Sequence, residues 1–227
     1  MKRVGLAGLA VVALAGCGAT HTAGSASLWI TRDHGAHVLL VRTVPAGLSA
    51  MQALQRSAKV QTSYGGRFVQ SIDGVSGSLS QRHDWFYYVN GYEADRAATE
   101  YTLHDGDVEW WDYRDWAHAI HVPVVVGAFP EPFVHGYAGK HRKAAVVFDS
   151  ASLVSLAKQV GKLIHATKVS PGELKQANVL FLTTADVSFT ATTKGAGQPV
   201  RFELSARDAR RLLNDKRLAR FRYAGLP

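Results

Sequence analysis

The residues of this sequence best suited to contacting a partner lie in one aromatic run at positions 84–91. In a strand, side chains alternate between two faces, so Trp85, Tyr87 and Val89 would share one face while two further rings occupy the other. One apolar face must be covered by core, and the second needs a partner, a ligand or a lid. Ordinary core packing and ligand contact both remain open for this run.

The dipeptide Asn90-Gly91 ends the aromatic run. Both residue types tolerate positive φ, which favours a tight hairpin turn at this point. A second aromatic run follows at positions 110–116. Because one small sheet cannot bury every one of these rings, we expect part of the aromatic surface to be exposed.

Residues able to catalyse a reaction or to hold a metal form no recognisable motif. The G-x-S-x-G, Walker A and H-E-x-x-H patterns are absent, and the G-x-G at 195–197 follows no strand-to-helix step. His118 and His121 are three apart, but their segment reads as extended and no carboxylate spacing supports them. We therefore predict no catalytic residue, no metal site and no required cofactor, and expect a protein that is not an enzyme.

Cys17 is the only cysteine, so the chain can form neither an intramolecular disulfide nor a site with several thiolates. It follows two basic residues, an apolar stretch at 4–15 and the small residues Ala15 and Gly16. This arrangement resembles the lipobox of bacterial lipoproteins, in which the cysteine is lipidated after cleavage before it. An ordinary signal peptide with an incidental cysteine is the alternative.

The lipobox resemblance implies a signal peptide at residues 1–16 and lipidation of Cys17. Residues 17–27 are mostly small and polar, as expected of a flexible tether. We therefore expect an extracytoplasmic protein held to the cell membrane by a lipid anchor.

With 47% hydrophobic and 19% charged residues among 227, the chain has the composition of a globular protein. Its formal charge of +8 favours anionic partners. Export argues against nucleic acid. The C-terminus is basic and would form either a solvated helix face or a contact with anionic lipid. Its cations are Arg201, Arg207, Arg210, Arg211, Lys216, Arg217, Arg220 and Arg222.

Residues 28–116 are predicted to form one α+β domain with a β-grasp, or ubiquitin-like, arrangement of strands around a single helix. The helix is expected at 50–58, with Ser49 as its N-cap. Alternation at 67–72 places Phe68 and Gln70 on one face of a strand and Val69 on the other. The other strands are expected at 28–32, 37–44, 60–64, 85–89, 99–103 and 108–113.

Four blocks of this domain, at 44–54, 66–75, 85–91 and 101–110, follow one pattern in order. The pattern resembles the DUF4430 family, which is similar to the C-terminal domain of transcobalamin and intrinsic factor. The resemblance implies a β-grasp fold over about residues 28–116.

In the cobalamin carriers of that resemblance, the equivalent domain closes over one face of the corrin ring. Carried over to this chain, it implies a ligand-binding set of Trp85, Tyr87, Val89 and Asn90, with a corrinoid as the ligand. Two features depart from the carriers: this chain has no separate helical domain for the second ligand face, and its Asn90-Gly91 turn replaces a longer segment.

Residues 117–227 are predicted to form a small α/β-type unit of unknown role. Residues 117–129 read as a linker that becomes a strand, and a buried strand follows at 144–148. Asp149 or Ser150 is a candidate cap for a helix that reaches position 164. Strands are expected at 176–184, 187–193 and 199–204, before a last helix that begins near Ser205.

These observations lead to one functional expectation and one alternative. We expect an exported lipoprotein that binds a corrinoid-like nutrient and delivers it to a transporter. The alternative is a module that binds a protein or an envelope polymer through its aromatic sheet, without a small-molecule ligand.

Overall fold

The computed structural model describes residues 24–172 and 176–227. In this part of the chain the fold is mixed α/β, with three α-helices and three sheets, and strands predominate. The predicted signal peptide at 1–16, Cys17 and most of the predicted tether lie outside the described residues.

The first sheet has the strand order β2-β1-β8-β6-β7. Its strands are β1 (Ser25–Arg32), β2 (His37–Pro45), β6 (His83–Val89), β7 (Tyr92–Glu93) and β8 (Val108–Asp115). β1 runs parallel to β8, and the other neighbouring strands are antiparallel. The aromatic run is therefore β6, and the antiparallel β6–β7 hairpin places Asn90 and Gly91 in its turn, both with positive φ. This confirms the turn predicted from the dipeptide.

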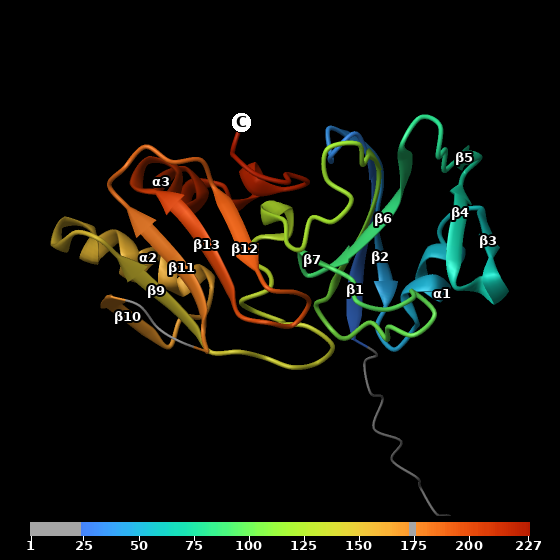
Figure 1. The fold of residues 1–227 in the computed structure, drawn as a ribbon. Helices are drawn as coiled ribbons and strands as arrows, with labels where there is room; N and C mark the ends of the chain where they lie inside the picture. The colour runs from blue at the N-terminus through green and yellow to red at the C-terminus, as the bar shows by residue number, and fades with distance from the viewer. Residues whose placement is uncertain (1–23, 173–175) are drawn as a thin grey trace, which may run out of the picture.

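Helix α1 (Ala50–Gln55) lies between this sheet and a small antiparallel sheet (Figure 1). Ser49 caps it as predicted: its hydroxyl accepts from the Gln52 N–H, and the Gln52 side chain accepts from the Ser49 N–H. The small sheet has the order β3-β4-β5 and is antiparallel. Its strands are β3 (Val60–Ser63), β4 (Phe68–Ile72) and β5 (Val75–Ser76), with the short 3₁₀ helix η1 (Tyr64–Gly66) between the first two.

The C-terminal sheet has the order β10-β9-β11-β13-β12 and is parallel except for β12 at its edge. Its strands are β9 (Ala144–Phe148), β10 (Lys168–Pro171), β11 (Asn178–Thr183), β12 (Thr190–Thr193) and β13 (Val200–Ser205). The helices are α2 (Val154–Leu163) and α3 (Ala206–Asn214), with short 3₁₀ segments η3 (Ala151–Leu153) and η4 (Lys216–Ala219). Ser205 caps α3, as the sequence predicted. Ser150, one of the two candidate caps, caps the short segment η3, while α2 has Leu153 at its N-cap position and no side-chain cap.

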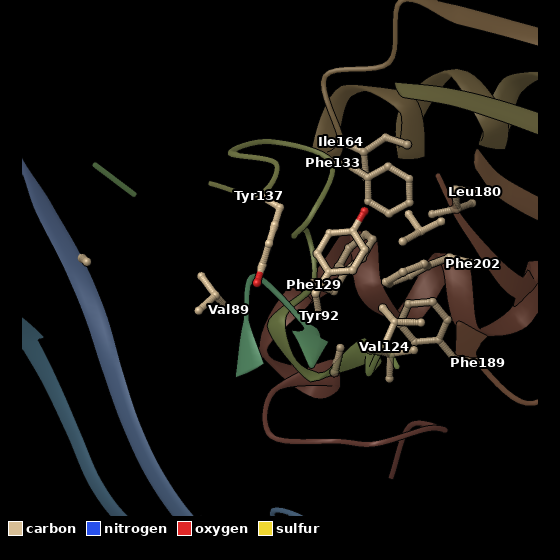
Figure 2. Close-up of a cluster of buried hydrophobic side chains, with 14 of the residues drawn as sticks. Val89, Tyr92, Val124, Phe129, Phe133, Tyr137, Ile164, Leu180, Phe189 and Phe202 are labelled. Atoms are coloured by element: carbon tan, nitrogen blue, oxygen red, sulfur yellow. The ribbon is translucent and has the colours of Figure 1, made fainter. Parts of the chain in front are cut away.

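The segment between β8 and β9 packs between the first sheet and the C-terminal sheet, and its aromatic residues join their cores (Figure 2). Phe133 packs edge-on against Phe202 with 5.0 Å between ring centroids, and Phe129 packs against Phe189 at 5.6 Å. A single cluster of buried apolar residues thereby extends from β1 to η4. We call this segment between β8 and β9, residues 117–143, the connector.

Two local predictions were wrong, and one strand was not predicted. The connector forms no strand: Val124 makes one isolated bridge to Tyr92 and is followed by the 3₁₀ helix η2 (Val126–Ala128). Residues 99–103 also form no strand, because only Thr102 pairs, in a bridge to Ser49. The sequence reading missed β10, whose four residues are half-buried or exposed and so give little apolar signal.

Candidate ligand-binding site

On β6, Trp85 and Tyr87 face the α1 side of the sheet. Trp85 is 6% exposed; its ring packs on Tyr113 and its indole N–H donates to the Val75 carbonyl oxygen at 2.8 Å. Tyr87 is half-buried and stacks on Trp111 with 4.8 Å between ring centroids. Its hydroxyl donates to the backbone carbonyl of Arg96. A neighbouring ring therefore packs against each of these two side chains.

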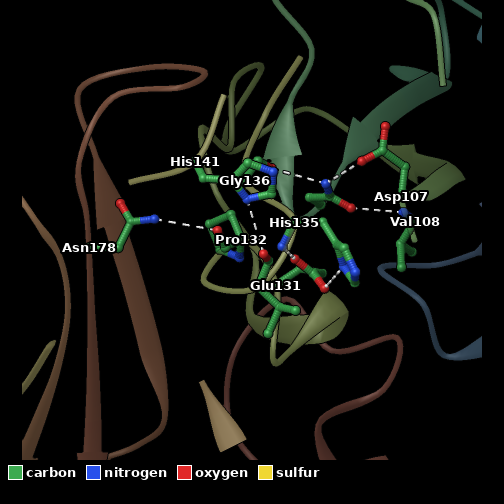
Figure 3. A network of polar contacts seen from close by, with 10 residues as sticks. Asp107, Val108, Glu131, Pro132, His135, Gly136, His141 and Asn178 are labelled. Carbon is green, nitrogen blue, oxygen red and sulfur yellow. Dashed lines mark hydrogen bonds and ion pairs between the residues drawn. The ribbon is translucent and has the colours of Figure 1, made fainter. Parts of the chain in front are cut away.

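Val89 and Asn90 are fully buried. Asp107, Val108 and Gly136, the partners of the Asn90 side chain, lie close together where β8 meets the connector (Figure 3). The Asn90 amide nitrogen donates to Asp107 Oδ1 at 2.7 Å and to the Gly136 carbonyl at 2.9 Å. Its amide oxygen accepts from the Val108 N–H at 2.7 Å. Asn90 thus links the β6–β7 turn to β8 and to the connector.

The second face of β6, with Phe86 and Tyr88, is covered by the C-terminal segment of the chain. Phe221 packs on Trp29 with 4.8 Å between ring centroids, and Tyr223 packs on Tyr88 at 5.7 Å. The Tyr223 hydroxyl also donates to Asp112 Oδ2 at 2.9 Å. The sequence reading treated this segment only as basic, although two aromatic residues within it signalled a packed end.

The four residues of the predicted ligand-binding set do not meet in one cavity. Trp85 is anchored toward β5, Tyr87 toward Arg96, and Asn90 toward the connector. Ligand binding by these residues stays a prediction, and a ligand reaching them would have to displace packed protein groups.

An open groove of about 490 Å³ lies on the outer face of the small sheet. Its apolar lining comes from Tyr64 and Leu79, each 83% exposed, and from Phe68, which is 43% exposed. The Tyr64 and Phe68 rings meet edge-on with 6.4 Å between centroids. Large apolar side chains gathered on an exposed concave surface are typical of a binding site. We call this surface the aromatic groove.

Polar groups lie beside the apolar lining of the aromatic groove. Gln61 and Gln70 contribute amides, and Asp84 contributes a carboxylate. Partial burial raises the pKa of Asp84 above its ordinary value. The backbone N–H of Trp85 donates to the carboxylate at 2.8 Å, which lowers the pKa by a smaller amount. The groove therefore combines aromatic and aliphatic surface with both hydrogen-bond donors and hydrogen-bond acceptors.

The sequence reading found part of this groove. The alternation at 67–72 predicted that Phe68 and Gln70 share a face, and both are exposed while Val69 is buried. The contributions of Tyr64 and Leu79 were missed. Tyr64 was expected at the end of a strand but begins the 3₁₀ helix η1, and Leu79 lies in a turn where alternation gives no signal.

Glu109 is fully buried on β8 in the core beneath Tyr87 and Trp111. One carboxyl oxygen accepts from the Trp111 indole N–H at 2.6 Å, and the other has no hydrogen-bond partner in the described part of the chain. Burial raises the pKa of this carboxyl well above its ordinary value of 4.5, so the folded protein holds Glu109 protonated where the unfolded chain ionises it.

This difference makes stability depend on pH. Above the ordinary pKa of glutamate, the free energy of unfolding should fall by up to about 1.4 kcal/mol per pH unit through Glu109 alone. Glu109→Gln removes the ionisation, so its stability relative to the natural protein should rise with pH. Urea unfolding at about pH 5 and about pH 8 measures this, with Glu203→Gln as a control for losing a carboxylate. If the difference in free energy of unfolding between Glu109→Gln and the natural protein is the same at both pH values, the folded protein does not hold Glu109 protonated.

Two further properties bear on function. Among residues 24–172 and 176–227, no group of three or more His, Cys, Asp or Glu side chains is placed to hold a metal ion. In the same residues no helix is long and apolar enough to cross a membrane.

Residues 47–115 match the family model described as Domain of unknown function (DUF4430), which confirms the resemblance drawn from the four sequence blocks. Comparison with curated proteins gives no match.

Two solved structures are similar to parts of the chain. A protein from Ruminococcus gnavus ATCC 29149, proposed to bind metal, is 14% identical over 40% of this chain and 97% of its own, with a TM-score of 0.33. Haptocorrin, solved in complex with cobinamide, is 14% identical over 40% of this chain and 26% of its own, with a TM-score of 0.32. The chain thus spans about a quarter of haptocorrin, and TM-scores this low do not establish a shared fold.

Proposed function

We propose that this chain is an extracytoplasmic, non-catalytic binding protein and that the aromatic groove is its ligand-binding site. The exposure of Tyr64, Phe68 and Leu79 around one concavity carries this proposal. Apolar side chains that gather in one exposed concavity gain favourable free energy when a ligand removes them from water. The groove is also supported by a sheet whose opposite face packs on α1, so the site is largely formed before a ligand arrives.

The chemistry of the groove suits a broad, partly apolar molecule edged with amides. Rings and the Leu79 side chain would cover the apolar face of such a molecule, while Gln61, Gln70 and Asp84 would bond its edge. A corrinoid has this character, and the DUF4430 pattern resembles a domain of the cobalamin carriers. A corrinoid is therefore the first ligand to test.

We further assign residues 28–116 to the β-grasp fold. The mixed sheet order β2-β1-β8-β6-β7, with parallel central strands β1 and β8 and with α1 packed on one face, supports this assignment. In this proposal residues 117–227 form the second unit, and Cys17 carries a lipid that holds the protein at the membrane. Delivery of the ligand to a transporter completes the proposed role.

The test is a titration of the mature protein with cobinamide, followed by quenching of tryptophan fluorescence and by calorimetry. Phe68→Ala should weaken binding about tenfold or more, equivalent to about 1.4 kcal/mol, because a groove ring loses its contact. Ile120→Ala is the matched control, since Ile120 is 55% exposed and does not line the groove. Equal affinities for both variants, or no binding at millimolar cobinamide, would sink the proposal.

A second candidate is a protein-binding role, favoured by the edge strand β2. β2 pairs only with β1, and its Val38, Leu39 and Val41 side chains are each about half exposed. An exposed apolar edge strand can accept a strand from another chain. This role would be favoured if the chain binds no corrinoid but captures a cell-envelope protein, and if Val41→Lys abolishes that capture.

A further inference from the structure

A second cavity, of about 410 Å³, lies between the two halves of the chain. Three segments far apart in the sequence line it: residues 95–96 after β7, residues 137–142 of the connector, and residues 196–198 in the turn between β12 and β13. Its volume is at the lower end of the range for small-molecule sites. We call it the junction pocket.

The lining of the junction pocket is strongly basic. Arg96, Lys140 and Arg142 supply three cations, and Asp95 is the only acidic residue among the lining residues. Asp95 is already engaged, because it accepts from Arg96 Nε at 2.8 Å and from the Tyr137 hydroxyl at 2.8 Å. The positive charge of Lys140 and Arg142 is therefore not balanced by the pocket's own carboxylate.

Lys140 and Arg142 are also available to an incoming group. Neither takes part in an ion pair with another described residue. Arg142 Nε donates to the Gly197 carbonyl at 2.9 Å, which holds the guanidinium against the turn. Within the described chain its two terminal nitrogens have no hydrogen-bond partner, so a fork of donors is left for a ligand.

Hydrogen bonds across the junction hold the walls of the pocket in place. The Tyr92 hydroxyl donates to the Gln198 carbonyl at 2.7 Å, and the Asp95 N–H donates to the Tyr137 hydroxyl at 3.3 Å. Tyr137 is itself buried against Tyr92 and Tyr101, with ring centroids 5.3 and 5.2 Å away. The cations are thus mounted on a rigid frame, which lowers the entropic cost of binding.

We infer that the junction pocket binds a small organic molecule through a phosphate group, at a site separate from the aromatic groove. A phosphate suits an adjacent guanidinium fork and ammonium better than a single-charged group does, because it presents several acceptor oxygens. The cavity exceeds the size of one phosphate ion, which leaves room for the organic part beside the Tyr137 wall. A free phosphate ester and a lipid headgroup offer the same chemistry.

Calorimetric titration with glycerol phosphate, and with glycerol as the uncharged control, tests the site. Lys140→Gln and Arg142→Gln should each weaken binding about tenfold, and added salt should weaken it further. Lys143→Gln is the matched control, because Lys143 is exposed and adjacent in sequence but does not line the pocket. Phe68→Ala in the groove should leave this affinity unchanged.

Two results would overturn the inference. One is equal weakening by Lys143→Gln, which would mean general surface charge. The other is no detectable heat of binding with millimolar glycerol phosphate. This holds even if the protein binds vesicles that contain phosphatidylglycerol, because the site would then not take a free phosphate ester. Failure of cobinamide to bind would leave the inference intact, since that result concerns the groove alone.

Discussion

Asn90→Ala is expected to lower the free energy of unfolding by about 3 kcal/mol, since each buried polar group left without its partner costs roughly 1–3 kcal/mol. The change removes the hydrogen bonds to Asp107, Gly136 and Val108, all at a buried position. It also places alanine at φ +51°, a conformation that asparagine adopts more easily. Urea unfolding measures the loss.

The control for this change is Asn214→Ala, because Asn214 is an exposed residue at the end of α3. It should change the stability by less than about 0.5 kcal/mol, as surface substitutions usually do. If Asn90→Ala is as mild as this control, Asn90 does not join the sheet to the connector, and a role in ligand contact becomes the better explanation of the residue.

Deleting residues 221–227 is expected to destabilise the protein by about 4 kcal/mol or more, in the range for losing a large buried aromatic group. The deletion uncovers Trp29 and Trp110, which Phe221 and Tyr223 contact. It also leaves the buried Asp112 carboxylate without the Tyr223 hydroxyl. Tryptophan emission should shift to longer wavelength as the indoles meet water, and a hydrophobic dye should bind.

Two point variants separate this packing from the effect of shortening the chain. Tyr223→Phe keeps the ring and removes only the donor to Asp112, so it should cost about 1–3 kcal/mol. Arg222→Ala changes an exposed side chain between the two aromatic residues and should be nearly neutral. A deletion that unfolds like the natural protein, with unchanged emission, would show that the C-terminal segment does not cover this face in solution.

Local features of the fold were predictable because short-range chemistry fixes them. Ser49 and Ser205 cap the helices they were expected to cap. The Asn90-Gly91 turn follows from the tolerance of both residue types for positive φ. Alternation along β4 likewise separates a buried from an exposed face.

Long-range features could not be read from the sequence. Tyr223 donates to Asp112 across 111 residues, and no local pattern specifies that pairing. The apolar connector was predicted to become a strand because periodicity reports burial and not the presence of a partner strand. The edge strand β7 is only two residues long, and it forms one bridge with the connector, between Tyr92 and Val124. The groove and the junction pocket depend on such tertiary contacts.

The most direct test of the proposed function is amide chemical-shift mapping by NMR during titration of the mature protein with cobinamide. The proposal predicts that the largest changes fall on β3, β4 and the neighbouring residues Tyr64 and Leu79, with little change at residues 140–142. Changes centred on Val89 and Asn90, or no saturable change in the groove, would contradict it.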